Sequence, residues 1–227
     1  MQTSYKKILN DVDSDQIVDA LAPYVTEARK ARIDGVLSAR LDGIRLAIES
    51  PSDINNALAA VRTAEILGVS TVYIIAAEGT AVCMKSVTQG AFYWVDIQFF
   101  ASWAAFFAFA CKARLTLAGG TPRASCELAS VPVDAPLCIV VGNERVGLSA
   151  QAKQDIAVLY KVPMFGMTDS YNLSVSAALS LYELTQQKRS QLGVDTDLST
   201  KQKTALKAKY YLNSVAPRLA EALLLRR

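Results

Sequence analysis

Residues 136–149 read PLCIVVGNERVGLS, and residues 159–176 read LYKVPMFGMTDSYNLSVS. Each stretch begins with a short apolar run that is typical of a buried strand, and continues into a polar loop that contains glycine. A helix-like pattern follows each loop. In α/β proteins, parallel strands are connected in this way, through a loop and a helix. The two stretches therefore predict two parallel strands that both end in polar loops.

The alternation of strand and helix patterns extends towards the amino terminus. Together with strands at 136–142 and 159–164, it predicts strands at 44–50, 70–79, 93–98 and 114–120, and helices at 54–68, 99–112, 148–156 and 172–190. This rhythm is typical of an α/β fold with a mostly parallel sheet and helices on both faces. Ligands of such sheets bind outside the carboxyl ends of the strands. Both polar loops are expected at that edge.

The two ends of the chain have a different pattern. The segment from Asp15 to Ala39 predicts one helix, or a pair of helices broken near Pro23 and Gly35. The segment from Leu198 to Arg227 carries seven Lys and Arg residues against one Glu, and predicts one or two helices. A basic amphipathic helix is either a solvated surface or an RNA contact, and the pattern leaves both open. We divide the chain into an N-terminal helical extension (1–40), a central domain (41–190) and a basic C-terminal helical extension (191–227).

Composition limits the class of protein. With 227 residues, 52% hydrophobic and 20% charged, the chain can form one large core with short extensions. The net charge of +3 permits a nucleic-acid partner without identifying one. The most apolar run, at 99–111, is shorter than the roughly 20 residues that cross a bilayer. The polar N-terminus is no secretory signal. We therefore expect a cytoplasmic protein with no membrane segment.

The residue types exclude several kinds of chemistry. The chain contains no histidine, which excludes Ser-His-Asp and Cys-His hydrolases. Its four cysteines form no C-x-x-C pair, so we expect no metal site and reduced, mostly buried thiols. No P-loop and no G-x-G-x-x-G turn are present. The remaining polar strand-end loops suit a nucleoside-like cofactor and a reaction that gains mainly from proximity.

Three segments resemble, in order and in spacing, the signature motifs of the TrmH branch of the SPOUT methyltransferases. They read NNALAAVRTAEILGV (55–69), IVVGNERVGLS (139–149) and VPMFGMTDSYNLSVSAALSLYE (162–183). The similarity extends over about residues 28–190. It implies methyl transfer from S-adenosyl-L-methionine to a ribose 2′-hydroxyl of RNA. It also implies a homodimer, and an α/β fold whose C-terminal part forms a deep trefoil knot.

The resemblance also implies a set of site residues. Arg62 matches the arginine thought to act on the 2′-hydroxyl, either as a base or by stabilising the developing alkoxide. The other matching catalytic positions are Asn56, Glu144, Ser170 and Asn172, and the matching cofactor-binding positions are Gly119, Gly142, Val162 and Tyr171. Tyr171 stands where the family usually has Leu, and Val162 where it usually has Ile.

Each of these residues also has a purely structural interpretation. Without the resemblance, Arg62 would be interpreted as a surface arginine and Glu144 as a solvated charge in an exposed loop. The resemblance instead gives Glu144 two alternative roles: to orient Arg62 across the dimer, or to anchor its loop by accepting N–H bonds. Asn56, Ser170 and Asn172 each stand near the start of a predicted helix, where such side chains serve as caps. Gly142 fits a turn that needs no side chain.

Three functions are compatible with the sequence. The branch favours ribose methylation of tRNA, usually of a guanosine in the D-loop. The alternatives are the same chemistry on 23S rRNA, and a non-catalytic RNA-binding member of the fold.

Overall fold

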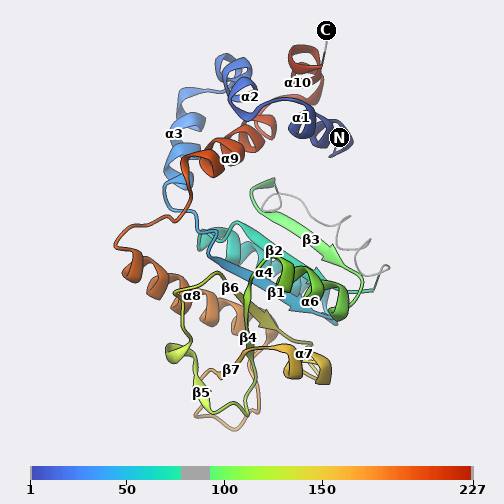
Figure 1. Cartoon of the computed structure of the whole chain (residues 1–227), viewed down its shortest axis with the longest axis vertical. Helices are drawn as coiled ribbons and strands as arrows, with labels where there is room; N and C mark the ends of the chain where they lie inside the picture. Colours follow the sequence, from blue (N-terminus) through green and yellow to red (C-terminus); the bar gives the residue numbers. More distant parts are fainter. Residues whose placement is uncertain (1, 78–92, 226–227) are drawn as a thin grey trace. The chain divides into compact units, whose positions relative to one another are not determined.

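The computed structural model of the protein describes residues 2–77 and 93–225 (Figure 1). The chain divides into two compact units. Residues 41–194 form the sheet unit, and residues 1–40 together with 195–227 form the helical unit.

The sheet unit is built on seven parallel strands among the described residues. They are β1 (Ile44–Glu49), β2 (Thr71–Ile75), β3 (Asp96–Phe100), β4 (Thr116–Gly120), β5 (Cys126–Glu127), β6 (Leu137–Val141) and β7 (Val158–Lys161). Their order across the sheet is β3-β2-β1-β6-β4-β7-β5, and every pairing is parallel. The predicted α/β fold with a parallel sheet is therefore confirmed.

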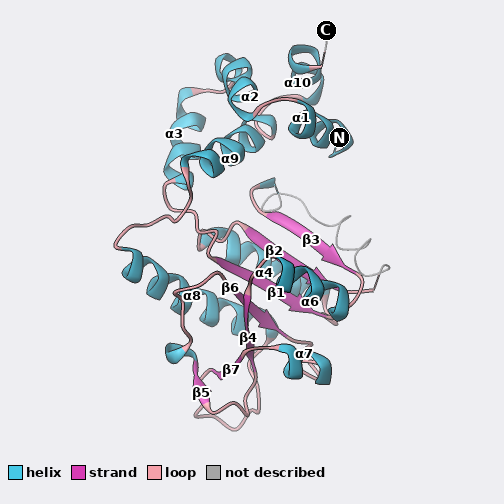
Figure 2. Cartoon of the chain, in the orientation of Figure 1, coloured by secondary structure: helices cyan, strands magenta, loops and turns pink. Residues whose placement is uncertain are grey.

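Helices cover both faces of this sheet, as Figure 2 shows. On one face, α4 (Ile54–Ile66) and α8 (Leu173–Leu192) bury apolar residues against β1 and β6. On the other face, α6 (Trp103–Lys112) and α7 (Ala150–Asp155) pack over a second apolar cluster. Burial on both faces explains why the central strands read as continuous apolar runs.

The region around β3 differs from the prediction. The sequence predicted a strand at 93–98 and a helix at 99–112, whereas β3 continues to Phe100 and α6 begins at Trp103. Phe100 pairs with Ile75 in the sheet, and Ser102 caps α6 by accepting a hydrogen bond from the Ala105 N–H at 3.3 Å. The serine cap, rather than the aromatic run, sets the start of the helix.

The helical unit contains α1 (Gln2–Asp11), α2 (Ser14–Leu21), α3 (Glu27–Leu37), α9 (Thr200–Leu212) and α10 (Pro217–Leu224). The predicted break near Pro23 is confirmed, because a short 3-10 turn at 22–24 separates α2 from α3. The predicted break near Gly35 is wrong, because Gly35 lies inside α3. An ion pair of 2.7 Å joins Lys207 to Asp34 and so links α9 to α3. The basic segment is thus part of a folded helical unit.

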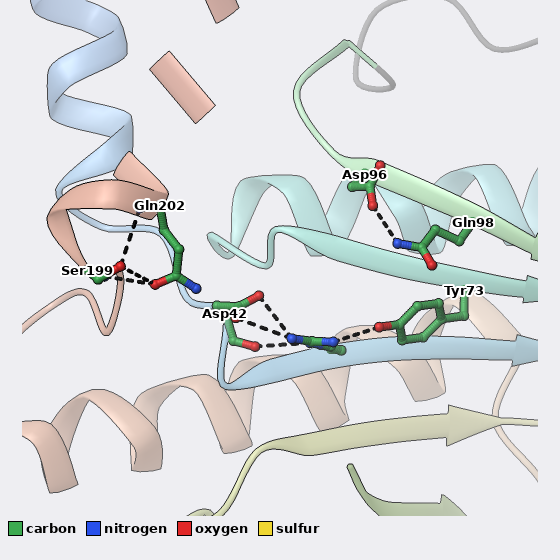
Figure 3. Close-up of polar contacts among 7 residues, drawn as sticks. Asp42, Tyr73, Asp96, Gln98, Ser199 and Gln202 are labelled. Carbon is green, nitrogen blue, oxygen red and sulfur yellow. Dashed lines mark hydrogen bonds and ion pairs between the residues drawn. The ribbon is translucent and has the colours of Figure 1, made fainter. Parts of the chain in front are cut away.

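A polar cluster closes the amino end of β1 (Figure 3). The guanidinium of Arg45 donates to the Tyr73 hydroxyl at 2.8 Å and to both carboxylate oxygens of Asp42 at 3.2 Å. Burial raises the pKa of Tyr73, which keeps the phenol neutral. Figure 3 also shows the helical unit's capping box, in which Ser199 and Gln202 exchange hydrogen bonds at the start of α9.

The described cysteines only partly match the prediction. Cys111, Cys126 and Cys138 are all free thiols. Cys138 is buried, but Cys111 is exposed and Cys126 is half-buried, so the expectation of mostly buried thiols is wrong. Cys111 is exposed because it lies on the outer side of the short helix α6. Cys83 lies outside the described residues.

Candidate active site

A pocket of about 820 Å³ opens at the carboxyl ends of three neighbouring strands, β4, β6 and β7. The loop after each strand contributes a wall: residues 120–123 after β4, 141–148 after β6, and much of the segment 162–173 after β7. Two of these walls are the polar loops that the sequence placed at this edge. The structure therefore confirms the prediction that the two loops converge.

The loop after β6 is a tight turn that depends on glycine. Asn143 and Gly147 exchange backbone hydrogen bonds of 3.1 and 2.9 Å, and Gly147 has a positive φ of 68°. A Cβ atom on Gly142 would lie 2.3 Å from the backbone of both Gly147 and Leu148. Gly142 lines the pocket, yet the turn itself already excludes a side chain there.

Glu144 anchors this loop to the start of α4. Its carboxylate accepts hydrogen bonds from the Ser52 N–H at 2.8 Å, the Ser52 hydroxyl at 2.6 Å and the Asp53 N–H at 3.4 Å. The Asn56 amide donates a fourth hydrogen bond at 3.1 Å. Glu144 is therefore held by donors from the loop that follows β1 and from the first turn of α4, about ninety residues away in the sequence.

The protonation state of Glu144 follows from these contacts. Partial burial acts to raise its pKa, but the hydrogen bonds from Ser52 and Asn56 outweigh that effect and lower the pKa to about 2. Glu144 is thus ionised at neutral pH. A carboxylate with so low a pKa is a weak proton acceptor, so this geometry favours an anchoring role over a general base.

Asn56 extends the connection to the third motif. While its amide nitrogen donates to Glu144, its oxygen accepts a hydrogen bond of 3.1 Å from the Asn172 amide. Asp53, not Asn56, caps α4, so the capping interpretation of Asn56 is wrong. Asn172 does cap α8, because its oxygen accepts from the Ser174 N–H at 2.8 Å. We call the set Ser52, Asn56, Glu144 and Asn172 the motif brace.

The residues of the loop after β7 lie along the pocket. Val162, Ser170 and Tyr171 all line it, and Ser170 is exposed. The Tyr171 hydroxyl donates to the Pro163 carbonyl at 2.9 Å, which ties the two ends of the loop together. Asn172 then begins α8. The sequence placed these side chains correctly at one edge of the sheet.

Comparison with known proteins agrees with this geometry. A model of the SpoU rRNA methylase family matches residues 43–182, which include the three walls of the pocket. The tRNA (guanosine(18)-2′-O)-methyltransferase of Borreliella burgdorferi is 30% identical over 204 residues, covering 88% of this chain and 92% of that protein. The chain belongs to the SpoU rRNA methylase family.

Solved SpoU methylase structures share the fold. The Aquifex aeolicus TrmH/SpoU tRNA modifying enzyme superimposes with a TM-score of 0.74 at 26% identity, covering 84% of this chain and 98% of that one. AviRb, a SpoU methyltransferase from Streptomyces viridochromogenes in complex with AdoMet, has a TM-score of 0.58 at 22% identity. That comparison covers 66% of this chain and 60% of AviRb, and it supports the fold.

Four of the predicted SpoU site residues lie outside the pocket wall: Asn56 and Asn172, which belong to the motif brace, and also Gly119 and Arg62. Gly119 faces away from it, and a Cβ atom there would lie 2.7 Å from the Ile156 side chain, while the neighbouring Gly120 does line the pocket. Arg62 is exposed on α4, and its side chain makes no hydrogen bond or ion pair within residues 2–77 and 93–225. The pocket of a single chain therefore lacks the predicted catalytic arginine.

Sequence reasoning missed the floor of the SpoU pocket. The fully buried Tyr160 donates a hydrogen bond of 2.7 Å to the Ser180 hydroxyl, and both residues line the pocket. Burial raises the pKa of Tyr160 far above its ordinary value, so it stays a hydrogen-bond donor. A tyrosine within a short strand pattern gives no sign of this role, because β-strands are rich in tyrosine.

The described residues lack two kinds of feature. They contain no cluster of three or more His, Cys, Asp or Glu side chains that could hold a metal ion. Within the same ranges, no helix is both long and apolar enough to cross a membrane.

Proposed function

We propose that this SpoU methylase transfers a methyl group from S-adenosyl-L-methionine to the ribose 2′-hydroxyl of a tRNA guanosine in the D-loop. The observation that carries the proposal is the convergence of three strand-end loops, two of which carry signature motifs, on one pocket at the carboxyl edge of the sheet. Its Borreliella, Thermus and Escherichia relatives bear the name tRNA (guanosine(18)-2′-O)-methyltransferase. Because tRNA is its proposed substrate, we also propose a cytoplasmic location.

The pocket residues fit the methyl donor. A volume of about 820 Å³ accommodates a nucleoside with an amino-acid tail, and the glycine-bearing turns expose backbone donors and acceptors. We assign cofactor binding to Gly119, through its carbonyl and its neighbour Gly120, and to Gly142, Val162 and Tyr171. The sulfonium donor supplies an activated methyl group. Positioning of the two reactants then provides most of the rate, which suits a chain without histidine.

In the proposed reaction, the 2′-oxygen forms a bond to the methyl carbon as the carbon–sulfur bond breaks. The hydroxyl proton leaves to a base or to solvent. We assign Arg62 to this oxygen, as base or as stabiliser of the alkoxide, and Ser170 to its neighbourhood. Asn56, Glu144 and Asn172 belong to the same catalytic set and hold its loops in place through the motif brace.

We further propose that the active unit is a homodimer in which Arg62 serves the pocket of the partner. Two observations support this. Arg62 lies outside the wall of its own pocket, and the neighbouring helix α8 exposes an apolar stripe of Val175, Leu179 and Tyr182. Tyr182 is 59% exposed, which is unusual for a large aromatic residue beside two other apolar ones.

Mixed dimers test this arrangement. Arg62→Ala removes the arginine, and Gly120→Leu blocks the pocket. If each site takes Arg62 from its partner, mixing the two inactive variants restores about a quarter of wild-type activity, because half the dimers are mixed and each has one complete site. Failure of two folded, exchanging variants to restore activity would show that Arg62 does not act across a dimer.

The finer fold and the RNA contacts are part of the proposal. Strand β7 lies beyond β4, yet the following helix α8 packs on β1, β6 and α4. We propose that the chain returns through the earlier loops as a deep trefoil knot. We also propose that the C-terminal extension, 191–227, contacts tRNA through the basic residues of α9 and α10.

Labelled methyl transfer to total RNA fractionated by size tests the function. The proposal predicts label in the tRNA fraction, at the 2′-oxygen of a D-loop guanosine. Label in 23S rRNA would instead establish the alternative substrate. Absence of label, together with no heat on calorimetric titration with S-adenosyl-L-methionine, would indicate a non-catalytic RNA-binding protein.

A further inference from the structure

The rim of the pocket carries three cationic side chains that belong neither to the motif brace nor to the predicted site residues. Arg123 lies in the loop after β4, Arg145 in the loop after β6, and Lys153 on α7. All three line the pocket and are exposed. Their side chains make no hydrogen bond or ion pair anywhere in the described part of the chain. They are therefore available to an anion at the pocket mouth.

The backbone holds these three positions in place. The Thr121 N–H donates to the Tyr160 carbonyl at 2.8 Å, and the Ala124 N–H closes the turn around Arg123 by donating to Thr121 at 3.3 Å. The Arg145 N–H donates to the Asn143 side chain at 2.8 Å. Lys153 sits on a helical turn, its N–H bonded to the Ser149 carbonyl at 3.0 Å. Three separate elements thus present cations around one opening.

This local charge contrasts with the rest of the sheet unit. Residues 41–194 contain 11 Lys and Arg against 12 Asp and Glu, so the unit as a whole attracts no polyanion. Two acids line the pocket, Glu144 and Asp169. The Glu144 carboxylate is occupied by four hydrogen bonds from Ser52, Asp53 and Asn56, which leaves Asp169 as the exposed acid at the pocket. The rim therefore has an excess of available positive charge.

We propose that Arg123, Arg145 and Lys153 bind the RNA phosphates that flank the target nucleoside and so position its ribose over the pocket. This inference rests on the proposed function. Phosphate contacts fix the register of a nucleic acid on a protein, and arginine binds a phosphate through two parallel hydrogen bonds. The three residues are positioning residues: their charge holds the strand, while the chemistry belongs to the site beneath them.

The salt dependence of RNA affinity tests the proposal. Each phosphate contact weakens binding roughly threefold between 50 and 200 mM salt, because counterions released on binding must be regained. The affinity for a labelled tRNA transcript can be measured by fluorescence anisotropy at both salt concentrations. For the triple variant Arg123→Gln/Arg145→Gln/Lys153→Gln, the loss of affinity between 50 and 200 mM salt should be roughly 30-fold smaller than for wild type. Methyl transfer should show a raised KM for RNA with kcat within a factor of about three, since saturating RNA restores the complex.

Two controls separate charge from structure. Arg123→Lys, Arg145→Lys and Lys153→Arg keep the charge and should keep the salt slope near that of wild type. Arg114→Gln removes an exposed cation just before the amino end of β4, at the opposite edge of the sheet, and should leave the slope unchanged. If Arg114→Gln reduced the salt dependence of RNA affinity as much as a rim substitution does, RNA binding would depend on the total charge of the protein and not on the rim.

The outcomes distinguish this proposal from the proposed function. If wild type transfers methyl groups to tRNA but the triple variant keeps the full salt slope, the rim proposal alone is overturned. If the triple variant binds S-adenosyl-L-methionine more weakly but keeps the salt dependence of its RNA affinity, the cations bind the carboxylate of the cofactor. That result would also overturn the rim proposal. If wild type transfers no methyl group, the proposed function fails before the variants are compared.

Discussion

Two hydrogen-bonded clusters, each built around one charged side chain, lie at opposite ends of β1. At the amino end, Arg45 bonds to Asp42, three residues away, and to Tyr73 on the adjacent strand. At the carboxyl end, Glu144 bonds to Ser52 and Asn56, about ninety residues away, and through Asn56 reaches Asn172. Both clusters satisfy their polar groups, but only the second joins distant loops around a pocket. Satisfied polar groups alone do not mark a functional site, whereas the convergence of distant loops does.

The largest contrast is expected for two glycine substitutions. Gly142→Ala brings a Cβ atom to 2.3 Å from the backbone of Gly147 and Leu148, so the turn that carries Glu144 must move. We expect a loss of methyl transfer of more than 100-fold, because a shift of about 1 Å in a site costs that much. Gly35→Ala, inside α3 with open space around it, should raise the free energy of unfolding by about 0.5–1 kcal/mol. Activity assays and denaturant unfolding of both variants measure this; an active Gly142→Ala enzyme would contradict the turn's role.

The second contrast compares the two charged centres. Glu144→Gln places an amide N–H₂ among the donors from Ser52 and Asn56, and should reduce kcat by about 10- to 100-fold through misplaced loops. Arg45→Gln should lower the free energy of unfolding by about 1–2 kcal/mol, since Arg45 is partly exposed, and leave kcat unchanged. Kinetics of both variants at saturating substrates decide the comparison. Equal losses of kcat would show that the two clusters do not differ in function.

The low pKa of Glu144 predicts that the stability of the fold depends on pH. The pKa of Glu144 is lowered from 4.5 to about 2 in the folded protein, so the carboxylate stabilises the fold above about pH 4.5. This stabilisation is lost as the pH falls from about 4.5 to about 2, because protonation of the folded state then disrupts the hydrogen bonds that Glu144 accepts. The difference in unfolding free energy between wild type and Glu144→Gln should therefore shrink from pH 6 to pH 2. A constant difference would mean that the hydrogen bonds do not depend on the charge.

The smallest contrast concerns two helix caps. Asn172→Ala and Ser102→Ala each remove a side-chain cap, of α8 and of α6 respectively, and each should lower the unfolding free energy by about 1 kcal/mol. Only Asn172 also bonds to Asn56, so only Asn172→Ala should reduce kcat. Thermal unfolding and initial rates test the pair. If Asn172→Ala loses stability alone, the residue is a cap and no more.

Much of the fold follows from local sequence pattern. The apolar runs at 44–50 and 136–142 correspond to β1 and β6, and the spacing after Asp53 corresponds to α4. Helix α1 and the two-residue strand β5 were missed, because their apolar content is too low to form a pattern. Tertiary contacts, rather than local propensity, hold such elements in place.

The site was predictable only in part, for a different reason. The pattern placed the loops around Glu144 and Ser170 at one edge of the sheet, since all carboxyl ends of parallel strands share that edge. The local pattern could not show which residues form hydrogen bonds with Glu144, because the donors Ser52 and Asn56 come from another part of the chain. The position of Arg62 outside the pocket likewise depends on how α4 packs, with Ala57, Val61 and Ala64 turned inward.

Hydrogen exchange of the amides with and without S-adenosyl-L-methionine tests most directly whether the three loops form one binding site. We expect that the cofactor protects amides in all three walls, 120–123, 141–148 and 162–173, while the amide of Arg45 at the amino end of β1 is unaffected. Protection of only one wall, or of none despite measured binding, would contradict it.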